Sequence, residues 1–367
     1  VRPAGRLLRA SGARPTACAG GKPWRLSASI VVLAPYRSVP DCEFTDSKTR
    51  DAVFDYRVCC VKRAARSTFM PDTMVFPGGA VEAEDVVTSA ELFGSRRDDL
   101  QSTLRCAAVR EAFEESGIGL FEPQLELSPE TYAAWRDSVH KDAAQFRTLC
   151  EEHTVAPALG SLSFWCSFVT PDTEHDRLSK GGFDARFFVC CATEAQLRMA
   201  ASDSKETVSL VWLTPSEALA AVENGRISMV PPQWYILREL ADACPRMSGV
   251  HAYAASPERA LQRDHPIKPY PAALEDRERA ELLQRHAGDH GVQADAKTGT
   301  PPAAFALCYP GDEAHPIFPG PNGARHRMLM VGAFGGRMRF ELQRDSAASW
   351  KLPLVETSSD WYSLAKL

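Results

Sequence analysis

The hydrophobic pattern of the chain predicts buried strands separated by amphipathic helices. Short runs rich in Val, Ile, Phe and Cys are typical of buried strands, and they occupy residues 26–34, 53–62, 162–170, 183–191 and 207–213. Helical spacing follows over residues 128–153 and around Trp234, Leu237 and Leu240. Thr214 and Pro215 predict the start of a further helix, because Pro is favoured at the first helical positions. We therefore expect regular structure up to about residue 245.

The pattern weakens beyond about Cys244, where the chain becomes polar and breaks often. Charged residues around 277–281 predict one helix, residues 303–309 predict a late strand, and the sequence from Pro310 onward predicts an irregular tail. Neither an internal repeat nor a separate domain motif is visible there. We therefore expect a main domain at 24–245, a C-terminal extension at 246–367 that packs on it, and an Arg-rich, disordered extension at 1–23.

Composition narrows the classes of function. The 367 residues include 44% hydrophobic and 24% charged residues, with a net charge of −5, which is ordinary for a globular protein. This balance argues against nucleic acid or an anionic membrane as a partner. The longest apolar stretch, residues 29–35, is far too short to span a bilayer. The 11 cysteines are odd in number and contain no C-x-x-C pair, so we expect reduced thiols.

Three carboxylates provide the strongest chemical signal. Glu111, Glu114 and Glu115 are spaced i, i+3, i+4, so on a helix they leave one face and repel each other. A hard divalent cation such as Mg²⁺ or Mn²⁺, which prefers oxygen ligands, would remove that repulsion. Gly117 fits a C′ position, where a helix ends with positive φ. For an isolated E-x-x-E-E, a solvated acidic helix end would be the more common explanation.

The residues around these carboxylates favour a metal site over a solvated acidic helix end. Read together with Phe76-Pro77-Gly78-Gly79, the segment 110–118 resembles the Nudix box, G-x5-E-x7-R-E-U-x-E-E-x-G-U, where U is aliphatic. Gly79 matches the opening glycine and residues 110–118 match the second half. Two features depart from the pattern: Asp85 stands in place of the first Glu, and an insertion at about 86–102 lengthens the box. The peroxisomal coenzyme A diphosphatases are a Nudix branch with an insertion at this place.

The resemblance implies an α/β protein, a Nudix α/β/α sandwich with a mixed central sheet. It implies a metal site for Mg²⁺ or Mn²⁺ formed by Glu111, Glu114 and Glu115. Arg110 is expected to pair with a neighbouring carboxylate and fix its rotamer. The insertion is expected to be a polar surface excursion that leaves the two ends of the box adjacent.

Further site residues are expected outside the helix. Gly78 and Gly79 permit a close backbone approach that a Cβ would forbid. Arg63 and Arg66, just upstream, are candidates to hold substrate phosphates, with a polar loop as the alternative. Glu206 and Asp85 are candidates for an additional acid at the site, although Glu206 is equally well explained as a solvated loop residue.

The function implied is metal-dependent hydrolysis of the diphosphate in coenzyme A or acyl-CoA, giving 3′,5′-ADP and a 4′-phosphopantetheine product. NADH, NADPH or ADP-ribose diphosphatase activity is the first alternative, because the same site can serve a different pocket. A non-catalytic Nudix-fold binding protein is the second alternative. The tripeptide Ala365-Lys366-Leu367 resembles a signal read by the peroxisomal import receptor. We therefore expect a peroxisomal location, with a mitochondrial address through the Arg-rich N-terminus as the alternative.

Overall fold

The computed structural model describes residues 22, 24–45, 53–65, 72–94, 96, 99–203, 207–289, 292, 301–332 and 338–345. Arg66, Glu206 and the C-terminal tripeptide 365–367 lie outside these residues, as does nearly all of the predicted N-terminal extension. No helix in the described part of the chain is both long enough and apolar enough to cross a membrane. The described cysteines are free thiols.

A mixed sheet forms the centre of the molecule. Its order is β3-β2-β1-β8-β7, with β4 also paired to β1 and β9 to β2. β1 and β8 run parallel, and the other pairs are antiparallel. The strands are β1 (Arg25–Pro35), β2 (Tyr56–Arg63), β3 (Met74–Val75), β4 (Gly78–Ala80), β7 (Ser163–Val169), β8 (Phe183–Cys191) and β9 (Thr207–Leu213). The five runs predicted from the hydrophobic pattern are therefore confirmed as strands of one sheet.

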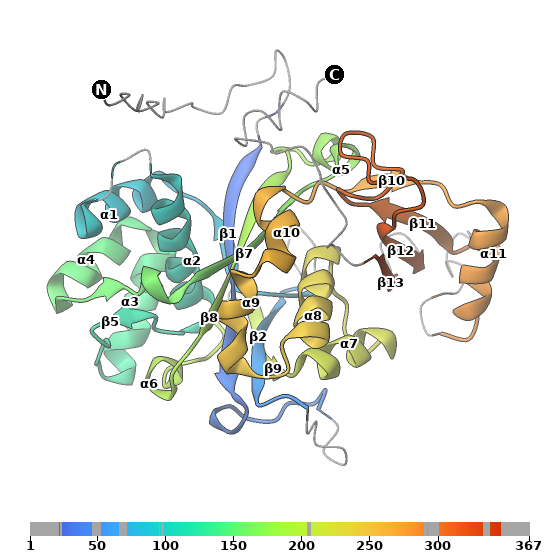
Figure 1. Ribbon diagram of the computed structural model, residues 1–367. Helices are drawn as coiled ribbons and strands as arrows, with labels where there is room; N and C mark the ends of the chain where they lie inside the picture. The colour runs from blue at the N-terminus through green and yellow to red at the C-terminus, as the bar shows by residue number, and fades with distance from the viewer. Residues whose placement is uncertain are drawn as a thin grey trace, which may run out of the picture.

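Helices cover both faces of this sheet (Figure 1). The first layer contains α1 (Ala83–Phe93), α2 (Leu100–Ser116), α3 (Pro129–Lys141) and α4 (Ala144–His153). The opposite layer contains α7 (Pro215–Glu223), α8 (Pro231–Ala243), α9 (Val250–Ala254) and α10 (Ala260–Asp264). Alternate residues of β1 serve the two layers: Ile30 and Val32 pack toward α2, whereas Val31 and Leu33 join the core that includes α8. Burial on both faces explains why β1 is continuously apolar.

Short elements connect these layers. They are β5 (Phe121–Glu122), β6 (Ala156–Pro157), α5 (Asp172–Arg177) and α6 (Glu194–Leu197), with 3₁₀ turns at Tyr36–Ser38, Leu159–Ser161, Met247–Gly249 and Pro257–Arg259. The helical structure expected at 128–153 is confirmed, but it is divided into two helices. Asp142 takes an extended conformation, with φ −153° and ψ 107°, and separates α3 from α4.

The insertion is more ordered than expected. α1 begins with a capping box between Glu82 and Asp85 and buries Thr88 and Ser89, and it contacts α2 and α4. The expected surface excursion is therefore wrong for residues 86–93, which pack as a helix. Its buried residues are small and polar, so hydrophobic periodicity gave no signal for it.

A second sheet follows the sandwich. β10 (Tyr270–Ala272), β11 (Ala303–Cys308), β12 (His326–Gly332) and β13 (Met338–Arg344) form an antiparallel sheet in that order, accompanied by α11 (Asp276–Arg285). The irregular tail expected after Pro310 is therefore wrong, because β12 and β13 lie within it. All residues of β12 are buried, because one face packs toward the main core and the other toward a smaller cluster with Leu282.

An ion pair and a hydrogen bond join this second sheet to the sandwich. Glu239 of α8 accepts from Arg259 at 2.6 Å and from Arg344 of β13 at 2.8 Å. Arg339 of β13 donates to the carbonyl of Val222 in α7 at 2.8 Å. Removing one partner of a buried pair leaves an uncompensated charge, so these contacts fix the second sheet against α7 and α8 (Figure 1).

Candidate active site

Helix α2 carries the predicted carboxylates, and both of its ends are capped. Asp99 accepts hydrogen bonds from the backbone N–H groups of Gln101 at 3.2 Å and Ser102 at 3.3 Å. The helix ends at Gly117, which has φ +63° and donates to the Phe113 carbonyl at 3.1 Å. The prediction of a C′ glycine is therefore confirmed. A Cβ on Gly117 would also lie 2.5 Å from the Met199 carbonyl oxygen.

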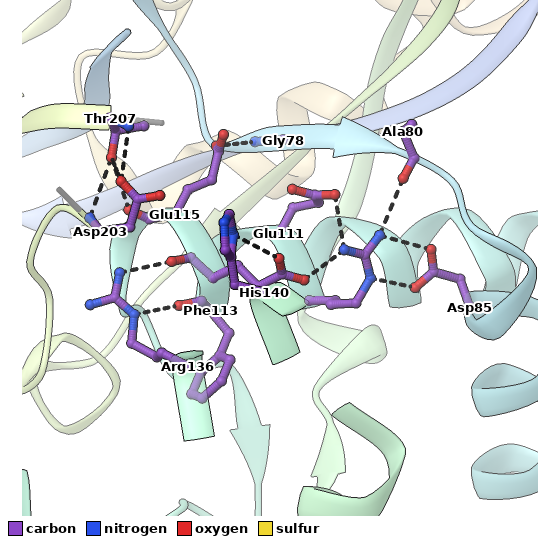
Figure 2. A network of polar contacts seen from close by, with 12 residues as sticks. Gly78, Ala80, Asp85, Glu111, Phe113, Glu115, Arg136, His140, Asp203 and Thr207 are labelled. Carbon is purple, nitrogen blue, oxygen red and sulfur yellow. Dashed lines mark hydrogen bonds and ion pairs between the residues drawn. The ribbon is translucent and has the colours of Figure 1, made fainter. Parts of the chain in front are cut away.

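A residue that sequence reasoning missed holds the last turn of α2. The Arg136 guanidinium on α3 donates to the carbonyls of Phe113 at 3.0 Å and Glu114 at 2.8 Å (Figure 2). A cation is favourable at a helix C-terminus, where the carbonyl groups lack intrahelical partners. Arg136 thereby positions the turn that carries Glu114 and Glu115. Nothing in its local sequence could have indicated this contact, since it comes from a different helix.

Arg110 is the centre of a buried charge cluster. Its side chain is 2% exposed and makes a two-pronged contact with Asp85, through Nε at 2.8 Å and Nη2 at 3.0 Å. Its Nη1 donates to Glu111 at 3.0 Å and to Glu114 at 2.6 Å. The expectation that Arg110 pairs with a neighbouring carboxylate is thus confirmed. Asp85, at the position of the first box Glu, is the buried partner that holds Arg110 in place.

The Phe-Pro-Gly-Gly loop lies directly against α2. The backbone N–H of Gly78 donates to Glu115 Oε2 at 2.9 Å. A Cβ on Gly79 would lie 2.3 Å from Glu111 Oε1, and one on Gly78 would lie 2.6 Å from the Cα of Ser29 on β1. The two glycines therefore allow β4 to pair closely with β1 and allow Glu111 to pack beside the loop. The ends of the interrupted box are adjacent, as expected.

Burial makes this group of carboxylates electrostatically unfavourable. It raises the pKa of Glu111 to about 8, against the opposing effect of Arg110, and it also raises the pKa of Glu114. His140 of α3 lies on the other side of Glu114, with Nδ1 3.7 Å from Oε2 (Figure 2). The cluster contains Asp85, Glu111, Glu114 and Glu115 against one buried arginine. Additional positive charge would stabilise the ionised carboxylates.

The three carboxylates match a hard cation by donor type, because Mg²⁺ and Mn²⁺ prefer oxygen ligands, and all three lie on one helix. They are not gathered around one point: within the described residues, no group of three or more His, Cys, Asp or Glu side chains is arranged to hold a metal ion. Arg110 engages Glu111 and Glu114, while the Gly78 N–H engages Glu115. A cation at this face would therefore compete with these partners.

The site opens into a cavity of about 1320 Å³. The predicted residues that line it are Gly78, Gly79, Arg110, Glu111, Glu114, Glu115 and Arg63. Asp85 does not line the cavity and lies behind Arg110. Arg66 and Glu206 are outside the described residues, although Thr207, next to Glu206, donates to the carbonyl of Glu115 at 3.4 Å. Sequence reasoning missed His140, which also lines the cavity, as do residues of the second sheet.

Comparison with known proteins gives consistent results. The family model described as the NUDT19 Nudix domain matches residues 24–102 and 98–240, so its two segments meet within the insertion. The acyl-coenzyme A diphosphatase NUDT19 of Homo sapiens is 30% identical over 291 residues, covering 66% of this chain and 74% of the relative. The protein of the same name from Xenopus laevis is 28% identical over 307 residues, covering 70% and 78%.

This chain belongs to the NUDT19 branch of the Nudix family. It is a Nudix diphosphatase, and its α/β/α sandwich is the Nudix fold with an additional C-terminal sheet. The predicted family and fold class are confirmed, despite the interrupted box. Among solved structures, a NUDIX hydrolase from Alicyclobacillus acidocaldarius aligns with a TM-score of 0.49 and 22% identity, covering 63% of this chain and 96% of that one.

Proposed function

We propose that this Nudix diphosphatase hydrolyses the diphosphate of coenzyme A and acyl-CoA, releasing 3′,5′-ADP and the corresponding 4′-phosphopantetheine. The observation that carries the proposal is the similarity to relatives named acyl-coenzyme A diphosphatase, which extends over 78% of the Xenopus laevis protein. The family model matches residues 98–240, a range that contains α2. The cavity supports it, because about 1320 Å³ exceeds the roughly 300–1,000 Å³ of ordinary small-ligand sites. A cavity of this size has room for a nucleotide joined to a long pantetheine arm.

We further propose that the reaction depends on Mg²⁺ or Mn²⁺, held by Glu111, Glu114 and Glu115. A divalent cation supplies neutralisation of the diphosphate and lowers the pKa of an attacking water. The raised pKa values of Glu111 and Glu114 support the proposal, because both carboxylates lie buried without enough neighbouring positive charge. A bound cation would offset the like-charge repulsion along this face of α2.

The chain's own residues hold the reacting groups in place. Arg110, fixed from behind by Asp85, orients Glu111 and Glu114. The Gly78 N–H orients Glu115, and Arg136 anchors the turn that carries Glu114 and Glu115. Arg63 lines the same cavity as a charged side chain for a phosphate group. His140 lies beside Glu114, where it adds a further polar group to the wall.

The test is product identification by chromatography after incubation with Mg²⁺, and separately with Mn²⁺. The substrates are coenzyme A, octanoyl-CoA, NADH and ADP-ribose at equal concentrations. The proposal predicts 3′,5′-ADP from both coenzyme A compounds, faster than AMP from the other two. AMP from NADH or ADP-ribose with coenzyme A left intact would overturn the substrate assignment. No cleavage of any compound with either metal would overturn the assignment of this site as catalytic in favour of a binding role.

A further inference from the structure

The two parts of the chain line the cavity differently. The sandwich supplies the charged and polar side chains, which include the three α2 carboxylates, Arg63 and His140, together with apolar ones such as Phe76 and Phe187. The residues that the C-terminal part of the chain adds to the lining are all apolar except Arg279. Arg279 itself donates to the Leu274 carbonyl at 3.3 Å. The second sheet therefore adds an apolar surface to a cavity that begins at the carboxylates.

The geometry of β11 and β12 explains this surface. Phe305 pairs with Met330 and Leu307 pairs with Met328, so these side chains lie on one face of the sheet. Leu307 and Met328 are buried in the main core, whereas Phe305 is only partly buried. Ala303, two residues before Phe305 on the same face, also lines the cavity. The strand thus runs from the core toward the cavity with one continuous apolar face.

An apolar lining suits only one part of the proposed substrate. Adenosine 3′-phosphate carries charges and hydrogen-bonding groups, which would lie unpaired against an apolar wall at a large cost. A fatty acyl chain has no polar group beyond its thioester, and its methylenes gain free energy wherever water is excluded. The proposed reaction places the diphosphate beside the carboxylates, so both the nucleoside and the pantetheine arm with its acyl chain extend away from them. Of these two ends, the acyl chain is the one that suits an apolar lining.

We propose that the C-terminal sheet and α11 form the acyl-chain subsite of this enzyme, with Ala303, Phe305, Met330 and Leu283 as its walls. The inference rests on the proposed function, because it concerns the acyl end of the same substrate. It assigns a role to the part of the chain that lies beyond the Nudix match at residues 24–240. The subsite takes a saturated acyl chain and raises the affinity for thioesters over free coenzyme A.

The wild-type enzyme tests this first. The kinetic constants are measured for coenzyme A, acetyl-CoA, octanoyl-CoA and palmitoyl-CoA, with release of 3′,5′-ADP as the readout and all thioesters below their micelle concentrations. Each methylene that enters the subsite lowers KM by up to about fourfold. We expect the KM for octanoyl-CoA to be at least about tenfold below that for acetyl-CoA. Equal KM values along the series would overturn the inference, because the apolar wall would then contact only the pantetheine arm.

Two variants test the named residues. Ala303→Trp fills the subsite, and Leu283→Gln places an amide in it at nearly constant volume. Both should lower the ratio of kcat/KM for octanoyl-CoA to that for coenzyme A by about tenfold. Ala280→Trp is the matched control, because Ala280 is exposed on α11 and does not line the cavity, and it should keep the wild-type ratio. The ratio is internal to each variant, so it is insensitive to the fraction of active enzyme.

The outcomes separate the two proposals. A wild-type ratio in both folded variants, Ala303→Trp and Leu283→Gln, would overturn the acyl subsite and leave the coenzyme A diphosphatase assignment intact. If Ala303→Trp does not fold, Leu283→Gln and the wild-type chain-length series still decide the question. No 3′,5′-ADP from any substrate of the series would overturn the proposed function, and the subsite with it.

Discussion

Replacing Asp85 by Asn removes the charge that holds Arg110 while preserving the size of the side chain. Asp85 is 1% exposed and Arg110 2% exposed, and two hydrogen bonds of 2.8 and 3.0 Å join them. Breaking a buried pair from one side costs about 3–5 kcal/mol. The lower end applies, because Arg110 keeps Glu111 and Glu114 as partners. We therefore expect the free energy of unfolding to fall by about 3 kcal/mol.

The matched control lies on the same helix. Glu91 of α1 pairs with Arg147 at 2.7 Å, but both side chains are substantially exposed, at 44% and 31%. Such a surface pair contributes about 0–1 kcal/mol, so Glu91→Gln should be nearly neutral. Urea unfolding followed by circular dichroism measures both variants. Since a 1 kcal/mol loss lowers Tm by about 2–4 °C in domains of moderate size, Asp85→Asn should also melt about 6–12 °C lower.

A second readout connects this pair to the site. Loss of Asp85 frees Arg110, whose contacts orient Glu111 and Glu114, so the kcat of the folded variant should fall by about tenfold or more. Equal unfolding free energies for Asp85→Asn and Glu91→Gln would refute the reasoning. The Asp85–Arg110 contact would then contribute no more than an exposed ion pair.

Three further perturbations follow from individual contacts. Gly79→Ala should lower the kcat for release of 3′,5′-ADP by about 10²-fold, because the new Cβ would lie 2.3 Å from Glu111 Oε1. Gly160→Ala is the control: its Cβ would enter open space, so kcat should not change. Gly117→Ala should lower the free energy of unfolding, measured in urea, by more than Gly94→Ala does. Both glycines have φ near +60°, but only at Gly117 would the new Cβ also lie against a backbone atom, at 2.5 Å. Burial lowers the pKa of His326 to about 4, below the ordinary 6.5, so its stabilising contribution is complete above pH 6.5 and is lost as pH falls toward 4. Between pH 7 and 5 this histidine alone should reduce the unfolding free energy by about 2 kcal/mol, and His326→Gln should reduce the pH dependence measured by urea unfolding.

The sequence revealed the parts of the site that lie on one element. Carboxylates at helical spacing and a C′ glycine are local patterns, and the structure places Glu111, Glu114 and Glu115 on one capped helix, as those patterns predict. Their supporting partners come from elsewhere in the chain. Arg136 reaches α2 from α3, and Asp85 does so from the first turn of α1. Contacts between distant segments leave no periodic trace, so only the fold could reveal them.

The strands also differ in how far the sequence alone could reveal them. Five strands of the central sheet contain apolar runs that can be recognised without tertiary information, because most of their residues are buried. β3 and β4, with two and three residues, gave no such signal. β12 is equally buried, but His326 and Arg327 open it, and both are buried through partners such as Asp312 and Tyr235. A strand that opens with two basic residues departs from the pattern of a continuous apolar run, so β12 gave a weaker signal. α1 escaped recognition because Thr88 and Ser89 occupy its buried face.

The most direct test of the account compares wild-type enzyme with Glu115→Gln, measuring 3′,5′-ADP released from coenzyme A in saturating Mg²⁺. Gln keeps an oxygen that can accept from the Gly78 N–H, which now bonds to Glu115 at 2.9 Å, so the loop and helix should keep their structure. The account predicts a fall in kcat of at least about 10²-fold with an unchanged circular dichroism spectrum and Tm. Glu115→Gln enzyme that releases 3′,5′-ADP at the wild-type rate would contradict it.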